Sequence, residues 1–383
     1  MAEICRWVRS RAARVPRGLL GMLALVALLE GLIRQVEPAI NGVEPWDWRR
    51  TGLAATESPE VRGASVLCFG DSLVKLGVQP QILQAKLEGG RTAYNLALCA
   101  GRAPATNFLL RRALQAGARP EALIVDFNDS FLAESPATTL RLYSEFLRPG
   151  ETRELARGMA RPDFASAVFA LQVLPSARNR FEIRRALREL GQGRADFAGR
   201  QANAVRLRRN WEANLGGQVT PKVAVPFPTD PSAWHWIQPA GWTADPTNVA
   251  HLLAFFERAE AHQIPVFWLL PPLHPGYSAR RAELGLDAPF DAFVAQVVAR
   301  FSRVVVVDGR GAKYDPSMFI DMAHLDRDGS TRLSVDLAAV LAENLARPGP
   351  RLVALPRFAS PVVVGIRGRS PVDDRFTLTA AAE

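Results

Sequence analysis

Residues 65–73 read Ser-Val-Leu-Cys-Phe-Gly-Asp-Ser-Leu. The continuous apolar run stops at Gly70, as a parallel strand buried on both faces does before a turn. Ser72 then stands at the carboxyl end of this strand, just before a helical stretch. A turn of this kind directs a serine hydroxyl and its backbone N–H into one cavity, which suits a nucleophile, although small polar residues after a strand are also ordinary turn residues.

The rest of the chain repeats this alternation of short strand patterns and helical patterns. Alternating strands and helices predict an α/β fold with a parallel sheet covered by helices on both faces. The expected strands are 65–69, 94–98, 122–127, 264–270 and 304–308, and the expected helices are 80–87, 104–116, 246–262, 286–301 and 329–346.

Two segments depart from the alternation. The first, about 140–245, begins with an arginine-rich helical pattern and continues, over 217–245, as a proline- and tryptophan-rich loop. We interpret it as a helical, Arg-rich insertion. The tail, 347–383, contains five prolines and one candidate strand at 362–366.

The composition is that of a folded protein. Of the 383 residues, 48% are apolar and 22% are charged, which excludes a disordered, collagen-like or disulfide-framework protein. The three cysteines, Cys5, Cys68 and Cys99, form no CxxC pair, which excludes a cysteine-rich zinc module. We read Cys68 and Cys99 as core thiols in interior strands. No metal site and no cofactor are expected.

The net charge of +9 is concentrated in two segments of the chain. Residues 1–17 carry five arginines against one acid, and residues 151–210 carry thirteen arginines against six acids, so the remainder is close to neutral. Only four of the 47 basic residues are lysines, which points to genome composition more than to phosphate recognition. We therefore expect no nucleic-acid partner.

The first forty residues resemble a membrane-targeting segment. The five arginines precede an apolar run over 18–33 that only Glu30 interrupts. A basic flank before a first apolar segment places the flank in the cytoplasm and the remainder on the periplasmic or extracellular side. Small-residue cleavage sites are missing after the run, so we favour an uncleaved single-pass anchor over a cleaved leader or a buried helix.

These patterns divide the chain into five parts. We expect a basic cytoplasmic leader (1–17), a signal anchor or transmembrane helix (18–35), a linker (36–61), an α/β domain with the insertion (62–346) and a C-terminal tail (347–383).

Further polar residues follow the expected strands. Asp321 precedes His324 by three residues and can orient its imidazole, so that the pair serves as a general base and its partner. The alternative is a capping aspartate beside a solvated histidine. Gly101 follows the second strand and Asn128 the third. With the Ser72 N–H, they supply donors for an oxyanion hole at one edge of the sheet.

The order Gly-Asp-Ser-Leu (70–73), Gly101, Asn128-Asp129 and Asp321-x-x-His324 resembles the SGNH (GDSL) hydrolase superfamily. The resemblance covers roughly 62–135 and 246–346. It implies a flavodoxin-like three-layer α/β/α fold and action on ester bonds. It assigns Ser72 as nucleophile, His324 as base, Asp321 as its partner, and Ser72, Gly101 and Asn128 as oxyanion donors. Asp126 departs from the pattern, because that family block usually starts with glycine.

An anchor, an SGNH-like body and an insertion together are similar to envelope-anchored proteins that move acyl groups on surface polysaccharides. The expected function is therefore a serine esterase or O-acyltransferase acting on ester-linked acyl groups, acetyl above all, of a cell-envelope carbohydrate or lipid. A multi-pass membrane acyltransferase is a candidate partner. The alternative is a non-catalytic envelope docking protein with the same fold that works with such an acyltransferase.

Two features of the insertion stay open. The arginine-rich stretch 178–209 either attracts an anionic polymer or anionic lipid head groups, or forms a solvated helical face, which we favour. The aromatic residues Trp234, Trp236 and Trp242 either offer platforms for sugar rings or fasten the insertion to the body, and we favour the second role.

Overall fold

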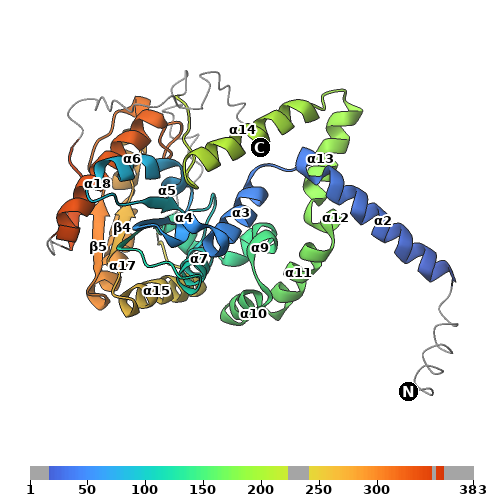
Figure 1. Ribbon diagram of the computed structural model, residues 1–383, viewed down its shortest axis with the longest axis horizontal. Helices are drawn as coiled ribbons and strands as arrows, with labels where there is room; N and C mark the ends of the chain where they lie inside the picture. The colour runs from blue at the N-terminus through green and yellow to red at the C-terminus, as the bar shows by residue number, and fades with distance from the viewer. Residues whose placement is uncertain (1–16, 223–240, 347–350, 358–383) are drawn as a thin grey trace, which may run out of the picture.

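The structure is a computed structural model that describes residues 17–222, 241–346 and 351–357 (Figure 1). At its centre lies one all-parallel sheet with the strand order β2-β1-β3-β4-β5-β6. The strands are β1 (Val66–Phe69), β2 (Ala93–Asn95), β3 (Ala122–Val125), β4 (Val266–Leu270), β5 (Val304–Asp308) and β6 (Leu352–Ala354). The first five follow the order 2-1-3-4-5 of a doubly wound, flavodoxin-like sheet, so the α/β prediction is confirmed.

Helices cover both faces of the sheet, which gives three layers. Along β1, Leu67 and Phe69 point into one apolar core while Val66 and Cys68 point into the other, because successive strand residues face opposite sides. One core is closed by α7 (Ala103–Gln115), α15 (Pro246–Ala261) and α17 (Asp287–Arg300), and the other by α5 (Ser72–Gly77), α6 (Pro80–Lys86) and α18 (Arg327–Ala346).

The sheet differs from the sequence expectation at two edges. The second strand ends at Asn95, so Cys99 lies in the following turn and not in an interior strand. The tail supplies β6, which pairs with β5 through the register Val306↔Leu352 and was missed because a three-residue strand carries no period. The candidate strand at 362–366 lies outside the described residues.

The insertion is helical, as expected. It contains α9 (Leu140–Phe146), α10 (Pro149–Gly158), α11 (Pro162–Val173), α12 (Pro175–Arg178), α13 (Arg180–Gly191) and α14 (Phe197–Ala213). Shorter helices flank the sheet edge, namely α8 (Asp129–Ala133), α16 (Pro275–Glu283) and the 3-10 turns Pro136–Thr139 and Pro316–Met318. Trp234 and Trp236 lie outside the described residues, whereas the indole of Trp242 donates a hydrogen bond to the Asp129 carbonyl at 2.8 Å.

The expected linker over 36–61 is instead part of the folded body. It forms the end of α2 (Arg17–Ile40), then α3 (Glu44–Glu57) and α4 (Pro59–Arg62). Trp48 of α3 is fully buried, and its indole N–H donates to the Cys99 carbonyl at 2.8 Å. The neighbouring Asp47 binds Lys75 of α5 at 2.7 Å, and both side chains are buried. A linker would leave such groups in water, so α3 belongs to the domain.

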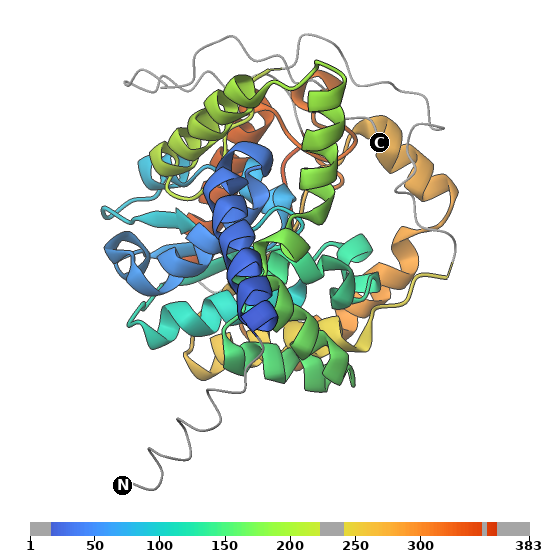
Figure 2. The ribbon, with the colours of Figure 1, turned by 90° about the vertical axis from the view of Figure 1, so that its right-hand side faces the viewer.

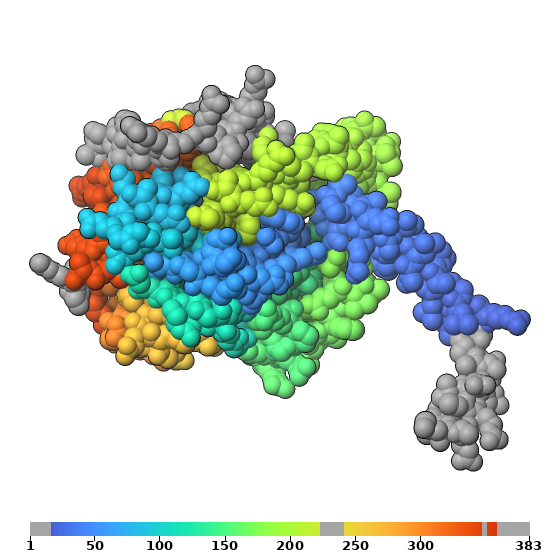
Figure 3. Space-filling model, viewed as in Figure 1, coloured from blue at the N-terminus to red at the C-terminus, as the bar shows by residue number. Residues whose placement is uncertain are grey.

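Helix α2 projects from the body (Figures 1 and 3). It has 24 residues and a mean hydropathy of 1.8 over its most apolar stretch, none of which is buried. At 1.5 Å per residue it is about 36 Å long, enough to cross a hydrocarbon core of about 30 Å. By length and composition α2 is a candidate membrane helix, either an anchor or a signal sequence.

Candidate active site

Ser72 is the first residue of α5, directly after the turn that ends β1. Asp71 caps this helix, since its carboxylate accepts the Leu73 N–H at 2.7 Å. Gly70 makes the turn with a positive φ of 128°, and a β-carbon there would collide with the Asp126 carboxyl group. The Ser72 N–H, in the first turn of α5, has no intrahelical acceptor.

His324 and Asp321 lie on a loop that the structure brings to Ser72. The Asp321 carboxylate accepts the backbone N–H groups of Ala323 (2.9 Å) and His324 (2.7 Å), so the loop fixes its own aspartate. The second Asp321 oxygen lies 2.6 Å from His324 Nδ1. His324 Nε2 lies 2.7 Å from Ser72 Oγ, although 252 residues separate them. These three predicted residues form one continuous hydrogen-bonded series.

The electrostatics of the series favour a histidine that accepts protons. Burial lowers the pKa of the His324 imidazole, but the hydrogen bond and negative charge of Asp321 outweigh it, so the pKa is raised overall. Burial by itself raises the pKa of Asp321, but the hydrogen bond and charge of His324 outweigh burial. The pKa of Asp321 is therefore lowered overall, and Asp321 stays ionised. This is the relation expected between a general base and the carboxylate that orients it.

Asn128 lies at the same edge of the sheet and caps α8. Its Oδ1 accepts the Ser130 N–H at 2.8 Å. Its Nδ2 has no hydrogen-bond acceptor among the described residues, and Asn128 lines the same cavity as Ser72. The Asn128 side chain thus uses its oxygen to cap α8 and keeps its NH2 group available as a donor to a ligand in the cavity.

Gly101 is placed differently from the expectation. Its N–H donates to the Leu98 carbonyl at 2.8 Å, and the residue does not line the cavity that contains Ser72. A β-carbon at this position would lie 2.6 Å from the Gly70 carbonyl oxygen. Close packing against the turn at Gly70 thus accounts for the glycine, and its amide is already in use, which argues against a role as oxyanion donor.

Beside the turn that precedes Ser72 lies a buried pair of carboxyl groups, Asp71 and Asp126. Asp126 Oδ1 accepts the Asp71 N–H at 2.9 Å, and both residues are 2% exposed. Burial, followed by the negative charge of Asp71, raises the pKa of Asp126 well above its ordinary value. Burial also raises the pKa of Asp71. Two buried carboxyl groups this close together are more stable when they share one proton than when both are ionised.

This pair predicts a pH-dependent stability change for Asp126→Asn. The asparagine keeps an oxygen for the Asp71 N–H but has no proton to lose. A group whose pKa is raised by folding stabilises the native state at low pH and loses this contribution as the pH rises through its folded pKa. The variant should therefore gain stability relative to the parent as the pH rises above about 4, by up to about 1.4 kcal/mol per pH unit.

Urea unfolding between acidic and neutral pH measures this difference. Asp328→Asn, which removes a carboxylate that is 45% exposed, is the matched control. A constant difference between Asp126→Asn and the parent would show that the pair holds no shared proton.

A cavity of about 570 Å³ opens beside Ser72. Its wall is mainly apolar and is built from the carboxyl ends of β3 and β4, α8, α16, α17 and the His324 loop. The apolar members include Phe131, Leu270, Leu273, Tyr277, Phe290 and Met322.

The two arginines in this wall are already paired. Arg281 binds Asp129 and Asp287, each at 2.6 Å. Arg310 binds Asp308 at 2.7 Å and Asp291 at 2.8 Å. Because each guanidinium faces two carboxylates, the cavity offers little attraction to an anionic ligand.

Sequence reasoning missed the functional context of two groups. Asp126 was noted only as a departure from a family pattern, although its position at the end of β3, beside Gly70, marks it as part of the site. Arg281 gave no signal, because its partner Asp129 is 152 residues away. Among the described residues, no group of three or more His, Cys, Asp or Glu side chains is arranged to hold a metal ion.

Comparison with known proteins does not assign the chain to a family. The chain matches no protein-family model, and no curated protein is similar to it in sequence.

Proposed function

We propose that this chain is an SGNH-type serine esterase or O-acyltransferase, held at the cell envelope by α2, that acts on ester-linked acyl groups of a carbohydrate or lipid. One observation carries the proposal. Ser72 Oγ, the His324 imidazole and the Asp321 carboxylate lie in series at 2.7 and 2.6 Å, and Ser72 and His324 line a cavity large enough for an ester substrate.

In the proposed mechanism His324 Nε2 takes the proton of Ser72 Oγ as this oxygen attacks the ester carbonyl. Asp321 stabilises the imidazolium that forms. The tetrahedral intermediate collapses when His324 returns the proton to the departing alcohol, which leaves the acyl group on Ser72. Water or a sugar hydroxyl then gives its proton to His324, attacks the acyl-enzyme and releases the acid or the new ester.

The Ser72 N–H and Asn128 Nδ2 are the donors for the oxyanion in this mechanism. Asn128→Ala should lower kcat about 100- to 1,000-fold, because one oxyanion donor contributes about 3–4 kcal/mol to transition-state stabilisation. Steady-state ester hydrolysis measures the loss. Full activity would remove Asn128 from the mechanism.

The Asn128→Ala change also removes the cap of α8, which by itself costs about 1 kcal/mol of stability. Asn128→Ser separates the two effects, since serine retains a capping oxygen but cannot place an amide donor in the cavity. We expect Asn128→Ser to keep the parent's unfolding midpoint and still to lose activity.

The size and apolar lining of the cavity bear on which acyl group the protein prefers. Acetyl fills only a small part of about 570 Å³, and the apolar wall with its neutralised arginines suits an uncharged chain of several carbons. Each added methylene that is buried contributes about 0.8 kcal/mol, or about a fourfold gain. We therefore expect kcat/KM to rise along 4-nitrophenyl acetate, butyrate and hexanoate.

Hydrolysis of this ester series by the full chain in mild detergent tests the proposal. Turnover that disappears in Ser72→Ala supports a serine hydrolase, and its dependence on chain length reports the acyl preference. Added sugar hydroxyls that divert the product from acid to new ester would favour the transferase. A folded protein with no serine-dependent turnover of any ester would instead favour a docking protein with this fold.

Contacts of α2 with the insertion favour an anchor that is retained. Glu37 binds Arg178 through both carboxylate oxygens, at 2.8 and 2.9 Å, and accepts from Asn179 at 3.2 Å. Glu30 accepts from the Ser176 backbone N–H at 2.8 Å. Removal of α2 as a signal sequence would take these partners away, so we place the body on the periplasmic or extracellular side of a single-pass anchor.

A further inference from the structure

The contacts between α2 and the insertion set the depth of the insertion relative to a membrane. The carboxylate of Glu30 is bound by the Ser176 N–H at 2.8 Å and also by the Ser176 hydroxyl. Ser176 is the second residue of α12, directly after α11. The junction between α11 and α12 therefore lies beside Glu30, in the middle of α2.

The apolar length of α2 then places this junction at the membrane. A hydrocarbon core of about 30 Å takes about twenty helical residues. The apolar run of α2 over 18–33 is about 24 Å long, and its residues are exposed except for Glu30 and Ile33, which are half-buried. Glu30 lies within this length. A bilayer around α2 consequently reaches the insertion helices that touch it.

Next to this contact the insertion carries exposed apolar side chains, on α11 and on α13. Phe169 and Val173, one turn apart on α11, are 66% and 51% exposed. Val173 precedes Ser176 by only three residues, so it is adjacent to the α2 contact, and Phe169 lies one turn further along α11. On α13, Leu187 and Leu190 are 63% and 60% exposed. Figure 2 shows α2 flanked by these green insertion helices, on the side of the body from which it projects.

The charges of α13 suit a lipid surface. Arg180, Arg184 and Arg188 are spaced four residues apart and form one exposed stripe of the helix, and the exposed Leu187 and Leu190 lie beside this stripe. Amphipathic helices with arginine on one side and leucine or phenylalanine on the other bind in the head-group region of bilayers. The same helix in open water would leave three large apolar side chains, Phe181, Leu187 and Leu190, uncovered beside a membrane helix.

We propose that the face formed by α11, α12 and α13 rests in the body-side leaflet of the membrane that α2 spans. Phe169 and Val173 then lie among the acyl chains near the head groups, and the arginines of α13 lie among anionic head groups. This membrane-contacting face holds the body against the bilayer at two places, α2 and the insertion. On this proposal α13 lies among lipid head groups, in contrast to the solvated face favoured from the sequence. The proposal does not depend on the chemistry of Ser72.

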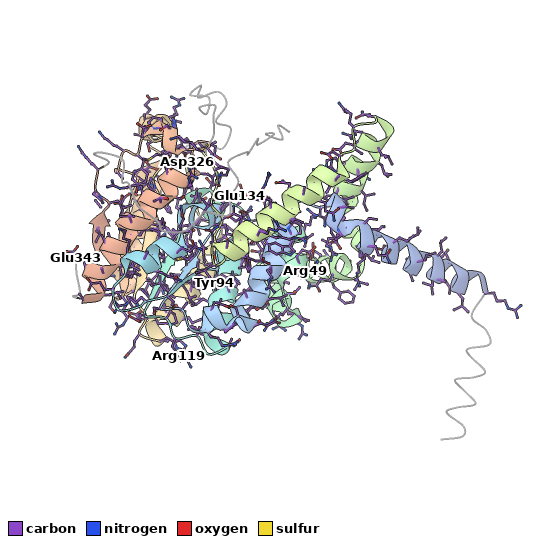
Figure 4. The ribbon with its side chains drawn as sticks, turned by 45° about the horizontal axis from the view of Figure 1, so that its top comes forward. Arg49, Tyr94, Arg119, Glu134, Asp326 and Glu343 are labelled. Atoms are coloured by element: carbon purple, nitrogen blue, oxygen red, sulfur yellow. The ribbon has the colours of Figure 1, made fainter. Side chains whose placement is uncertain are left out.

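The test uses the full chain in vesicles of mixed zwitterionic and anionic phospholipid. Val173→Cys, in a background of Cys5→Ser, Cys68→Ala and Cys99→Ser, carries a polarity-sensitive fluorophore. Glu343→Cys is the matched control, because Figure 4 places Glu343 on α18 at the opposite end of the molecule from α2. Each label is exposed to a lipid-attached quencher and to iodide in water.

We expect the label at Val173 to be quenched by the lipid-attached quencher and protected several-fold from iodide, and the label at Glu343 to behave in the opposite way. Charge reversal of Arg180, Arg184 and Arg188 to glutamate should reduce the protection at Val173. Equal iodide quenching at both positions would overturn the proposal. Protection of Val173 from both quenchers would also overturn it, because it indicates contact with a protein and not with lipid.

Discussion

Ser72→Ala should lower ester hydrolysis by about 10,000- to 1,000,000-fold, the loss typical when the nucleophile of a serine–histidine mechanism is removed. The reason is structural as well as chemical. In the proposed mechanism Ser72 Oγ forms the acyl-enzyme, and His324 Nε2, 2.7 Å away, takes its proton.

The control for this variant is Ser166→Ala, a change of the same kind at an exposed position of α11, and it should retain full activity. Both variants should keep the parent's circular dichroism and unfolding midpoint. Appreciable hydrolysis by purified Ser72→Ala, after contaminating esterase is excluded, would show that another group attacks the ester.

The second large effect concerns the buried ion pair of Lys75 and Asp47. Lys75 Nζ lies 2.7 Å from Asp47 Oδ1 and 3.0 Å from the Ala97 carbonyl oxygen, and the two side chains are 0% and 1% exposed. Lys75→Met leaves the Asp47 carboxylate buried without its cation. Breaking a buried pair in this way typically costs about 3–5 kcal/mol of stability.

Urea unfolding in mild detergent measures this loss. Lys86→Met, an exposed lysine on α6, should change stability by less than about 0.5 kcal/mol. The double variant Lys75→Met/Asp47→Leu should recover most of the stability, because replacing both ions by apolar groups removes the unpaired charge. If Lys75→Met were as stable as Lys86→Met, α3 would not be fixed to the body by this pair.

The sheet and the edge that carries the candidate site were predictable because they rest on local signals. The apolar runs of β1, β3, β4 and β5 are each followed by turn residues, and the carboxyl ends of parallel strands meet at one edge. Ser72, Asn128 and His324 could therefore be placed together without knowledge of any contact. The spacing of Asp321 and His324 also predicted their hydrogen bond, because it closes within one loop.

The parts that sequence reasoning misjudged depend on distant partners. The segment 36–61 reads as a linker until Trp48 is seen to donate to Cys99 and Asp47 to pair with Lys75. Gly101 follows a strand, as an oxyanion donor should, but its amide turns back to Leu98. Asp126 breaks a local pattern, and its meaning emerges only from its position against Asp71. None of these contacts leaves a periodic signal in the chain.

The most direct test of the central claim is the site of reaction with a serine-directed fluorophosphonate, identified by mass spectrometry of the full chain. We predict a single phosphonyl group on Ser72, absent from Ser72→Ala and formed far more slowly in His324→Ala, because the histidine activates the hydroxyl. A folded chain that gains no adduct at Ser72, or gains it at the same rate without His324, would contradict the serine–histidine mechanism.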